Sequence, residues 1–187
     1  MMESLRIEGQ SGHSSNPALG ANALEAMHKA MAALMQLREQ WGKQYQNPGF
    51  DVAAPTLNLA AIHGGDAPNR ICGHCELAFD VRLMPGMRSN EIREIMRNTV
   101  NEAVAGLGVK ASMQPIFEGV EAFLQDNTSD IIQTAEALTQ HRARSVNFAT
   151  EAPFPQQMGM QTVVLGPGSI DCAHQADEYI ALDQIEP

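Results

Sequence analysis

Basic residues, cysteines and long apolar runs are all scarce in this sequence. Its 187 residues include 12 Lys and Arg against 22 Asp and Glu, which gives a formal net charge of -10. Nucleic acids and anionic membranes attract proteins through clustered Lys and Arg, so the composition argues against either partner. No apolar run approaches the ~20 residues of a membrane-spanning helix, and residues 1–4 do not resemble the start of a signal peptide.

The three cysteines, Cys72, Cys75 and Cys172, are few and odd in number. This is typical of reduced thiols in a cytosol, so we expect a cytoplasmic protein. Cys72 and Cys75 have the spacing of half a zinc knuckle, but no second Cys/His pair follows. A strand predicted at 71–82 would also point them to opposite faces. We therefore expect core and surface roles for these two residues, not metal binding.

The first 113 residues predict the element order β-α-β-β-α-β. Two stretches carry apolar residues at three- and four-residue steps, which is the stripe of an amphipathic helix. The first begins after Asn22, which with Glu25 forms a capping pattern, and the second begins at Ser89 as a plausible N-cap. Short strand-like runs surround them. The predicted strands span residues 5–9, 56–62, 71–82 and 109–113. This order folds as a four-stranded antiparallel sheet with both helices on one face, the ferredoxin-like arrangement.

The pattern changes from Gln114. A helix at 129–138, a strand near 146–148, a short helix and a buried strand at 162–165 are predicted. Alternating helices and strands indicate parallel strands and hence part of a larger α/β sheet. Two such strands cannot shield both faces and both edges. The predicted domains are therefore 1–113, an α+β domain, and 114–187, a piece of an α/β domain.

His13 and His174 are the histidines best placed for chemistry. His13 lies in the Gly-rich segment 9–15, where glycines leave a ring uncovered; an ordinary exposed loop histidine fits the pattern too. His174 follows the predicted buried strand in a Gly/Pro loop, a position from which an imidazole can bind zinc. Catalytic zinc needs about three protein ligands, so one histidine makes no metal site. Glu178 could orient this ring, or could simply be solvated.

Arg82 lies on the polar face of the third predicted strand. Its planar guanidinium suits a substrate carboxylate. The alternative is an ion pair with Asp80 or Glu76 on the same face, worth only ~0–1 kcal/mol if exposed. A serine nucleophile is not predicted, since no Gly-x-Ser-x-Gly elbow is present.

Six motifs together resemble a known family. They occupy residues 9–15, 55–59, 63–72, 80–82, 150–154 and 166–179. Their types and order are similar to those of the dinuclear-zinc amidohydrolases, the metallopeptidase family that includes acetylornithine deacetylase and succinyl-diaminopimelate desuccinylase. The resemblance covers essentially the whole chain. It implies that residues 1–113 are a lid or dimerisation domain and that 114–187 are the C-terminal part of the catalytic zinc-hydrolase domain.

The resemblance also implies roles for individual residues. His13 matches a lid histidine that reaches the partner subunit's active site and stabilises the tetrahedral oxyanion. Asn69 and Arg82 match lid residues that hold the substrate, Arg82 through its carboxylate. His174 matches the terminal zinc ligand. For Glu151 we hypothesise that it lines the pocket and attracts the ammonium of the substrate's side chain.

The implied activity is the zinc-dependent hydrolysis of a small N-acyl amino acid, with Co²⁺ as an alternative ion, in a homodimer formed through the lid. The 55–59 and 150–154 motifs favour N-acetyl-L-ornithine, giving L-ornithine and acetate in arginine biosynthesis, over a succinyl-diaminopimelate desuccinylase. The family's first metal ligands and its general base would precede Met1, and its last helix would follow Pro187. We therefore expect no activity from this chain alone. A third interpretation is a non-catalytic dimerisation module.

Overall fold

The computed structural model describes residues 1–146 and 148–184, which fall into two compact units. The first unit comprises Met1–Leu124 with Arg144–Ala149, and the second comprises Gln125–Ala143 with Thr150–Pro187. No helix of the described residues is both long and apolar enough to cross a bilayer.

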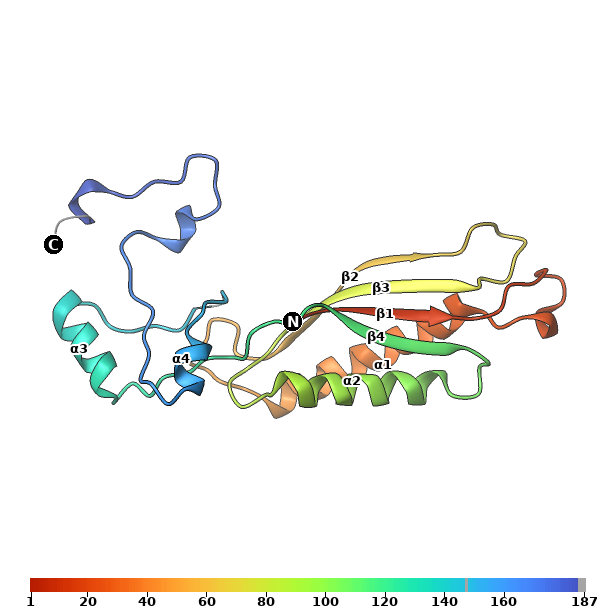
Figure 1. Cartoon of the computed structure of the whole chain (residues 1–187), viewed down its shortest axis with the longest axis horizontal. Coiled ribbons are helices and arrows are strands. Elements are labelled where there is room, and N and C mark those ends of the chain that lie inside the picture. The colour runs from red at the N-terminus through yellow and green to blue at the C-terminus, as the bar shows by residue number, and fades with distance from the viewer. Residues whose placement is uncertain (147, 185–187) are drawn as a thin grey trace. The chain divides into compact units, whose positions relative to one another are not determined.

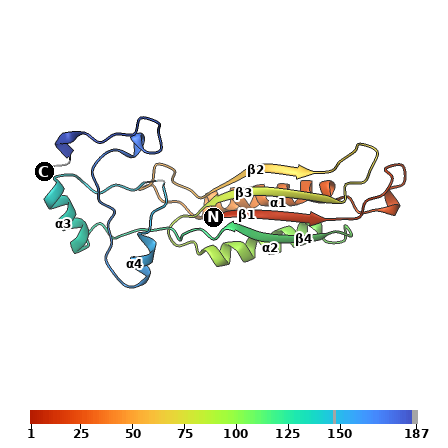
Figure 2. The ribbon, with the colours of Figure 1, turned by 45° about the horizontal axis from the view of Figure 1, so that its top comes forward.

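The first unit is a four-stranded antiparallel sheet with two helices on one face (Figure 1). The strands are β1 (Met2–Glu8), β2 (Thr56–Gly64), β3 (His74–Arg82) and β4 (Lys110–Phe117), in the order β2-β3-β1-β4. The helices are α1 (Ala23–Gln44) and α2 (Ser89–Val104). Figure 2 shows α1 beneath the β2–β3 side of the sheet and α2 beneath the β4 side. The predicted ferredoxin-like arrangement is confirmed, although β4 extends four residues beyond the predicted strand.

The core lies between the sheet and the two helices because alternate strand residues point to the helix side. Leu5 and Ile7 of β1 are fully buried, as are the helix residues Met27 and Met96. Burying a side chain of this size stabilises the fold by about 1.5–3 kcal/mol. Of the methionines predicted as core filler on α1, Met27 is buried and Met31 packs partly against the core, whereas Met35 is 40% exposed.

The two helices begin differently. Asn22 caps α1 as predicted, since its Oδ1 accepts hydrogen bonds from the N–H groups of Leu24 (3.0 Å) and Glu25 (3.4 Å). The predicted Ser89 cap is wrong: Ser89 is the first residue of α2, and no side chain of the preceding residue caps the helix. The Glu121 carboxylate instead accepts from the Ser89 N–H (3.1 Å) and hydroxyl (2.6 Å). A residue 32 positions away supplies the negative charge that a helix N-terminus favours.

A buried ion pair occupies the start of β1. Glu3 is fully buried on the helix side of the sheet, and its Oε1 accepts from the Arg93 Nε of α2 at 2.8 Å. Arg93 also reaches the Glu118 carboxylate at 3.1 Å. The sequence does not reveal this pair, because a carboxylate at a core-facing strand position reads as a break in the apolar pattern.

The second unit contains α3 (Asp130–Thr139) and α4 (Pro153–Gln157). The predicted helix at 129–138 is confirmed. The predicted strand at 162–165 is wrong: these residues form no strand, and Val164 and Leu165 are 53% and 63% exposed. A strand exists only when paired, and no neighbouring strand is present in the described part of this unit. Near 146–148, Val146 and Phe148 lie outside any strand, and Asn147 is outside the described residues.

Candidate functional site

Two loops at one end of the sheet are joined by backbone hydrogen bonds. We call residues 9–22, which follow β1, and 65–73, which precede β3, the loop pair (Figure 1). The N–H groups of Gly9, Ile71 and Ser14 donate to the carbonyls of Gly73 (2.9 Å), Gly12 (2.8 Å) and Asn69 (3.1 Å) respectively. Two segments that are distant in sequence therefore behave as one surface, and this surface carries His13 and Asn69.

Close backbone approach explains two of the loop glycines. Gln10 and Ala21 exchange both backbone hydrogen bonds at 2.9 Å, which folds the 9–22 loop back on itself. A Cβ on Gly9 would overlap the Ala21 carbonyl oxygen, and a Cβ on Gly20 would overlap that of Gln10. Only glycine fits at these two positions.

His13 is exposed, and its ring is hydrogen-bonded through one nitrogen. Nδ1 lies 2.7 Å from the Ser15 Oγ and accepts from the Ser15 backbone N–H at 3.2 Å. Nε2 has no hydrogen-bond partner within residues 1–146 and 148–184. The sequence pattern indicated His13 but not Ser15. The only sequence feature that hints at the contact is the position of Ser15, two residues after His13 in a Gly-rich loop.

Arg82 lies far from His13 within one chain. Arg82 is the last of the nine residues of β3, eight steps of ~3.3 Å, or about 26 Å, from the first residue after the loop pair. The Arg82 Nε donates to Asp80 Oδ2 at 2.7 Å. This is the ion pair that the sequence offers as the alternative to binding a substrate carboxylate. Because the Arg82 side chain is 55% exposed, the pair stabilises the fold by no more than ~1 kcal/mol. The structure therefore brings His13 and Asn69 together and leaves Arg82 at the opposite end of the sheet.

Cys72 and Cys75 both belong to the core, which corrects the expectation that they point to opposite faces. The strand begins at His74, three residues later than predicted, because residues 71–73 bond to the 9–22 loop and to the start of α1 instead of continuing the ladder. Cys72 is therefore free to turn inward, and its Sγ lies 3.1 Å from the His74 carbonyl oxygen.

Thiol labelling should separate the three cysteines. Burial, with a contribution from the neighbouring Cys72, raises the pKa of Cys75, so less reactive thiolate forms there. Cys172 is only partly buried. With iodoacetamide near neutral pH we expect Cys172 to react at least about tenfold faster than Cys75, as measured by mass spectrometry of peptides. Equal rates in the folded chain would contradict the burial of Cys75.

His174 lies in a strained turn of the second unit. It is exposed, and its φ is 60°, a left-handed backbone conformation that residues other than glycine adopt uncommonly. Its backbone N–H donates to Glu178 Oε2 at 3.1 Å. Glu178 therefore holds the backbone of the turn and, in this structure, does not orient the ring.

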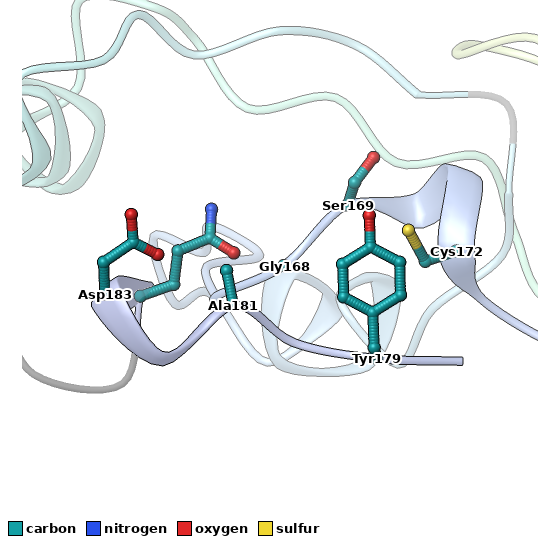
Figure 3. A pocket seen from close by; sticks show the side chains of 7 residues that line it. Gly168, Ser169, Cys172, Tyr179, Ala181 and Asp183 are labelled. Carbon is teal, nitrogen blue, oxygen red and sulfur yellow. The ribbon is translucent and has the colours of Figure 1, made fainter. Parts of the chain in front are cut away.

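A hollow of about 280 Å³ lies in the same segment of the chain (Figure 3). Its lining includes Ser169, Cys172 and Tyr179, and Figure 3 shows their side chains with those of Ala181 and Asp183 around the opening. Glu151, the remaining predicted site residue, is exposed just before α4, and its carbonyl accepts from the Phe154 N–H at 3.0 Å.

The described residues of this chain do not form a zinc site by themselves. Within the described residues, no group of three or more His, Cys, Asp and Glu side chains could hold one ion. A catalytic zinc needs about three protein ligands. We therefore assign no step of a reaction to a metal bound by this chain alone.

Comparison with known proteins agrees with the fold. A family described as the peptidase dimerisation domain matches residues 1–106. The acetylornithine deacetylases of Vibrio cholerae and Vibrio vulnificus are 45% and 47% identical to the chain over 183 residues. Each match covers 98% of this chain and 48% of the relative. The chain thus spans about half the length of the curated relatives it matches.

Solved structures share the fold at low sequence identity. A tripeptidase from Staphylococcus aureus gives a TM-score of 0.65 at 18% identity, covering 86% of this chain and 41% of that one. An aminopeptidase from Bacillus cereus gives 0.63 at 18% identity, covering 90% and 44%. The sheet, its two helices and these likenesses define an α+β domain of the kind found in peptidases. The chain belongs to the M20 peptidase dimerisation domain family.

Proposed function

We propose that this chain is the lid and the C-terminal catalytic segment of a homodimeric, zinc-dependent acetylornithine deacetylase. The observation that carries the proposal is 45–47% identity, over 98% of the chain, to proteins of that name. The enzyme would hydrolyse N-acetyl-L-ornithine to L-ornithine and acetate, for arginine biosynthesis in the cytoplasm. Residues 1–113 would be the lid, and 114–187 would complete the catalytic domain.

Each candidate residue then has a role that its chemistry suits. The unpartnered Nε2 of His13 would donate a hydrogen bond to the oxyanion that develops on the acetyl carbonyl. Asn69, adjacent to His13 in the loop pair, would hold the substrate, and Arg82 would bind its carboxylate through a bidentate contact. His174 would be one ligand of a zinc ion, or of Co²⁺, and the other ligands would come from outside the described residues.

The length of the sheet supports a site shared between two chains. The loop pair that carries His13 and the residue Arg82 lie at opposite ends of β3, a strand about 26 Å long, so one lid cannot present both to one small substrate. A two-fold axis that pairs two lids antiparallel brings the loop pair of one chain to the Arg82 end of the other. The proposed homodimer therefore lets one centre use His13 and Asn69 from one chain and Arg82 from its partner.

The side of the lid formed by β2 and α1 suits this dimer contact. β2 is an edge strand, and Ile62 on it is 44% exposed. The adjacent stripe of α1 exposes Leu24 and Met35, at 47% and 40%. The other edge strand, β4, contains Pro115, which has no N–H for pairing. The outward residues of α2 beside it are mostly polar or charged, including Asn90, Glu91, Glu94, Asn98 and Asn101.

Met35→Glu should weaken the dimer. Placing an unpaired carboxylate in an apolar interface costs several kcal/mol, so we expect the dissociation constant to rise at least about 100-fold. Asn98→Glu, on the polar face of α2, is the matched control and should leave it unchanged. Analytical ultracentrifugation measures both. A Met35→Glu chain that dimerises as tightly as the Asn98→Glu chain would exclude the β2–α1 interface.

Glu151→Gln should raise KM for N-acetylornithine in the complete enzyme about tenfold if Glu151 attracts the substrate's ammonium group. The same variant should not change KM for N-acetylnorvaline, which lacks that ammonium. Steady-state kinetics with the two substrates provide the comparison, and an unchanged KM for N-acetylornithine would remove the hypothesis.

Two assays of the complete protein test the proposed function. With zinc present, we expect kcat/KM for N-acetylornithine to exceed that for succinyl-diaminopimelate by at least about 100-fold, because the acyl pocket must separate a methyl from a charged chain. The reverse preference would favour the desuccinylase. Tight dimers that hydrolyse neither substrate would favour the non-catalytic module.

A further inference from the structure

Ser15 is the only residue that hydrogen-bonds the His13 ring among the described residues. Its Oγ lies 2.7 Å from Nδ1, and its backbone N–H donates to the same nitrogen at 3.2 Å. The other ring nitrogen, Nε2, makes no hydrogen bond to the described residues, and His13 as a whole is exposed. The two nitrogens are therefore held in different environments.

The backbone N–H and the hydroxyl of Ser15 together decide which nitrogen carries the proton. A neutral imidazole has one N–H and one acceptor nitrogen, whereas a backbone N–H can only donate. A proton on Nδ1 would face the Ser15 N–H across 3.2 Å, with neither group able to accept. With Nδ1 unprotonated, both the amide and the hydroxyl of Ser15 can donate to it, and the ring proton is on Nε2.

We propose that Ser15 is a positioning residue that holds neutral His13 as the Nε2–H tautomer. This inference rests on the proposed function of His13, and it says how that function is prepared. An oxyanion needs a hydrogen-bond donor at the place where charge develops. Nε2–H is such a donor, whereas the other tautomer would present a lone pair to the developing negative charge.

The backbone around His13 keeps this geometry in place. The Ser14 N–H donates to the Asn69 carbonyl at 3.1 Å, and the Asn16 N–H donates to the His13 carbonyl at 3.1 Å. The Ser15 amide is thus fixed between two bonded neighbours. The His13 ring can therefore hydrogen-bond to this amide without any rearrangement of the loop. A preorganised donor requires such a fixed setting.

Nitrogen-15 NMR of the 187-residue chain tests the tautomer without any assay of activity. Long-range proton–nitrogen correlations at about pH 8.5, where a free imidazole is neutral, report the protonated nitrogen of each ring. The His13 signals are identified by their loss in His13→Asn. Exposed His28 on α1, whose ring makes no such contact with residues that the structure describes, serves as the internal reference. We expect the Nε2–H to Nδ1–H ratio of His13 to exceed that of His28 at least about fivefold.

Substitutions at Ser15 provide the second arm. Ser15→Ala keeps the amide but loses the hydroxyl, so the ratio should fall toward that of His28; Ser15→Thr should preserve it, and Ser14→Ala is the neighbouring control. In the complete enzyme, Ser15→Ala should lower kcat about tenfold with little change in KM, and Ser15→Thr should restore kcat. A predominant Nδ1–H form, or a ratio equal to that of His28, would overturn the proposal.

The outcomes separate this proposal from the function it rests on. If His13→Ala leaves kcat unchanged, the oxyanion role of His13 fails whatever the tautomer. If His13→Ala abolishes turnover but Ser15→Ala changes neither the tautomer ratio nor kcat, His13 keeps its role and the positioning role of Ser15 is wrong.

Discussion

His13→Ala in the complete enzyme is expected to lower kcat about 10²–10³-fold, the range found when one oxyanion donor is removed. KM for N-acetylornithine should change less than about threefold, because the interaction with His13 forms as negative charge develops in the transition state. His13 is exposed, so replacing it should not unfold the chain, and the fall in kcat should not come from unfolding. Steady-state kinetics of the purified variant provide the measurement.

His141→Ala is the matched control for this experiment. His141 is also an exposed histidine, but it belongs to the second unit, just after α3. Its removal should leave kcat and KM unchanged. A His13→Ala enzyme with normal kcat and a raised KM would mean that His13 binds the ground state of the substrate, and the oxyanion role would be rejected.

Arg93→Met is expected to destabilise the chain by about 3–5 kcal/mol, the usual cost of removing one partner from a buried ion pair. Glu3 is fully buried, and its Oε2 already has no hydrogen-bond partner in the described structure. Without Arg93, the whole carboxylate would lack a counter-charge. Urea unfolding of the 187-residue chain gives the change in the free energy of unfolding.

Two further variants make this result specific. Arg97→Met removes an exposed partner of Glu94 on the same helix and should cost less than about 1 kcal/mol. Glu3→Met combined with Arg93→Met replaces both charges by apolar groups and should recover most of the lost stability. If Arg93→Met destabilises the chain no more than Arg97→Met does, Glu3 and Arg93 do not form a buried ion pair.

Local periodicity made the first unit predictable. Side-chain alternation and helical stripes are set by neighbours within a few residues, and they identified all four strands and both helices of the first unit. The same rule failed at 162–165, where an apolar run predicts a strand but a strand also needs a partner. It failed as well at Glu3, whose burial depends on Arg93, 90 positions away.

The candidate site was only partly predictable for a related reason. The glycines around His13 predicted that its ring is uncovered, and His13 is exposed in the structure. The hydrogen bond between the Ser14 N–H and the Asn69 carbonyl joins segments 55 positions apart, and no local pattern encodes such a contact. The contact of Ser15 with the ring depends on the folded loop, so its role in setting the tautomer could be inferred only from the geometry.

Mixed dimers test most directly whether one centre draws residues from two chains. Enzyme with His13→Ala in every chain, and enzyme with His174→Ala in every chain, should both be nearly inactive. When the two complete chains are unfolded, combined in equal amounts and refolded, about half of the dimers contain one of each. In those dimers one centre joins an intact His174 to the partner's intact His13, so we expect about a quarter of the wild-type activity. Activity that stays at the level of the separate variants, in a sample shown to contain mixed dimers, would place His13 in the centre of its own chain and contradict the shared site.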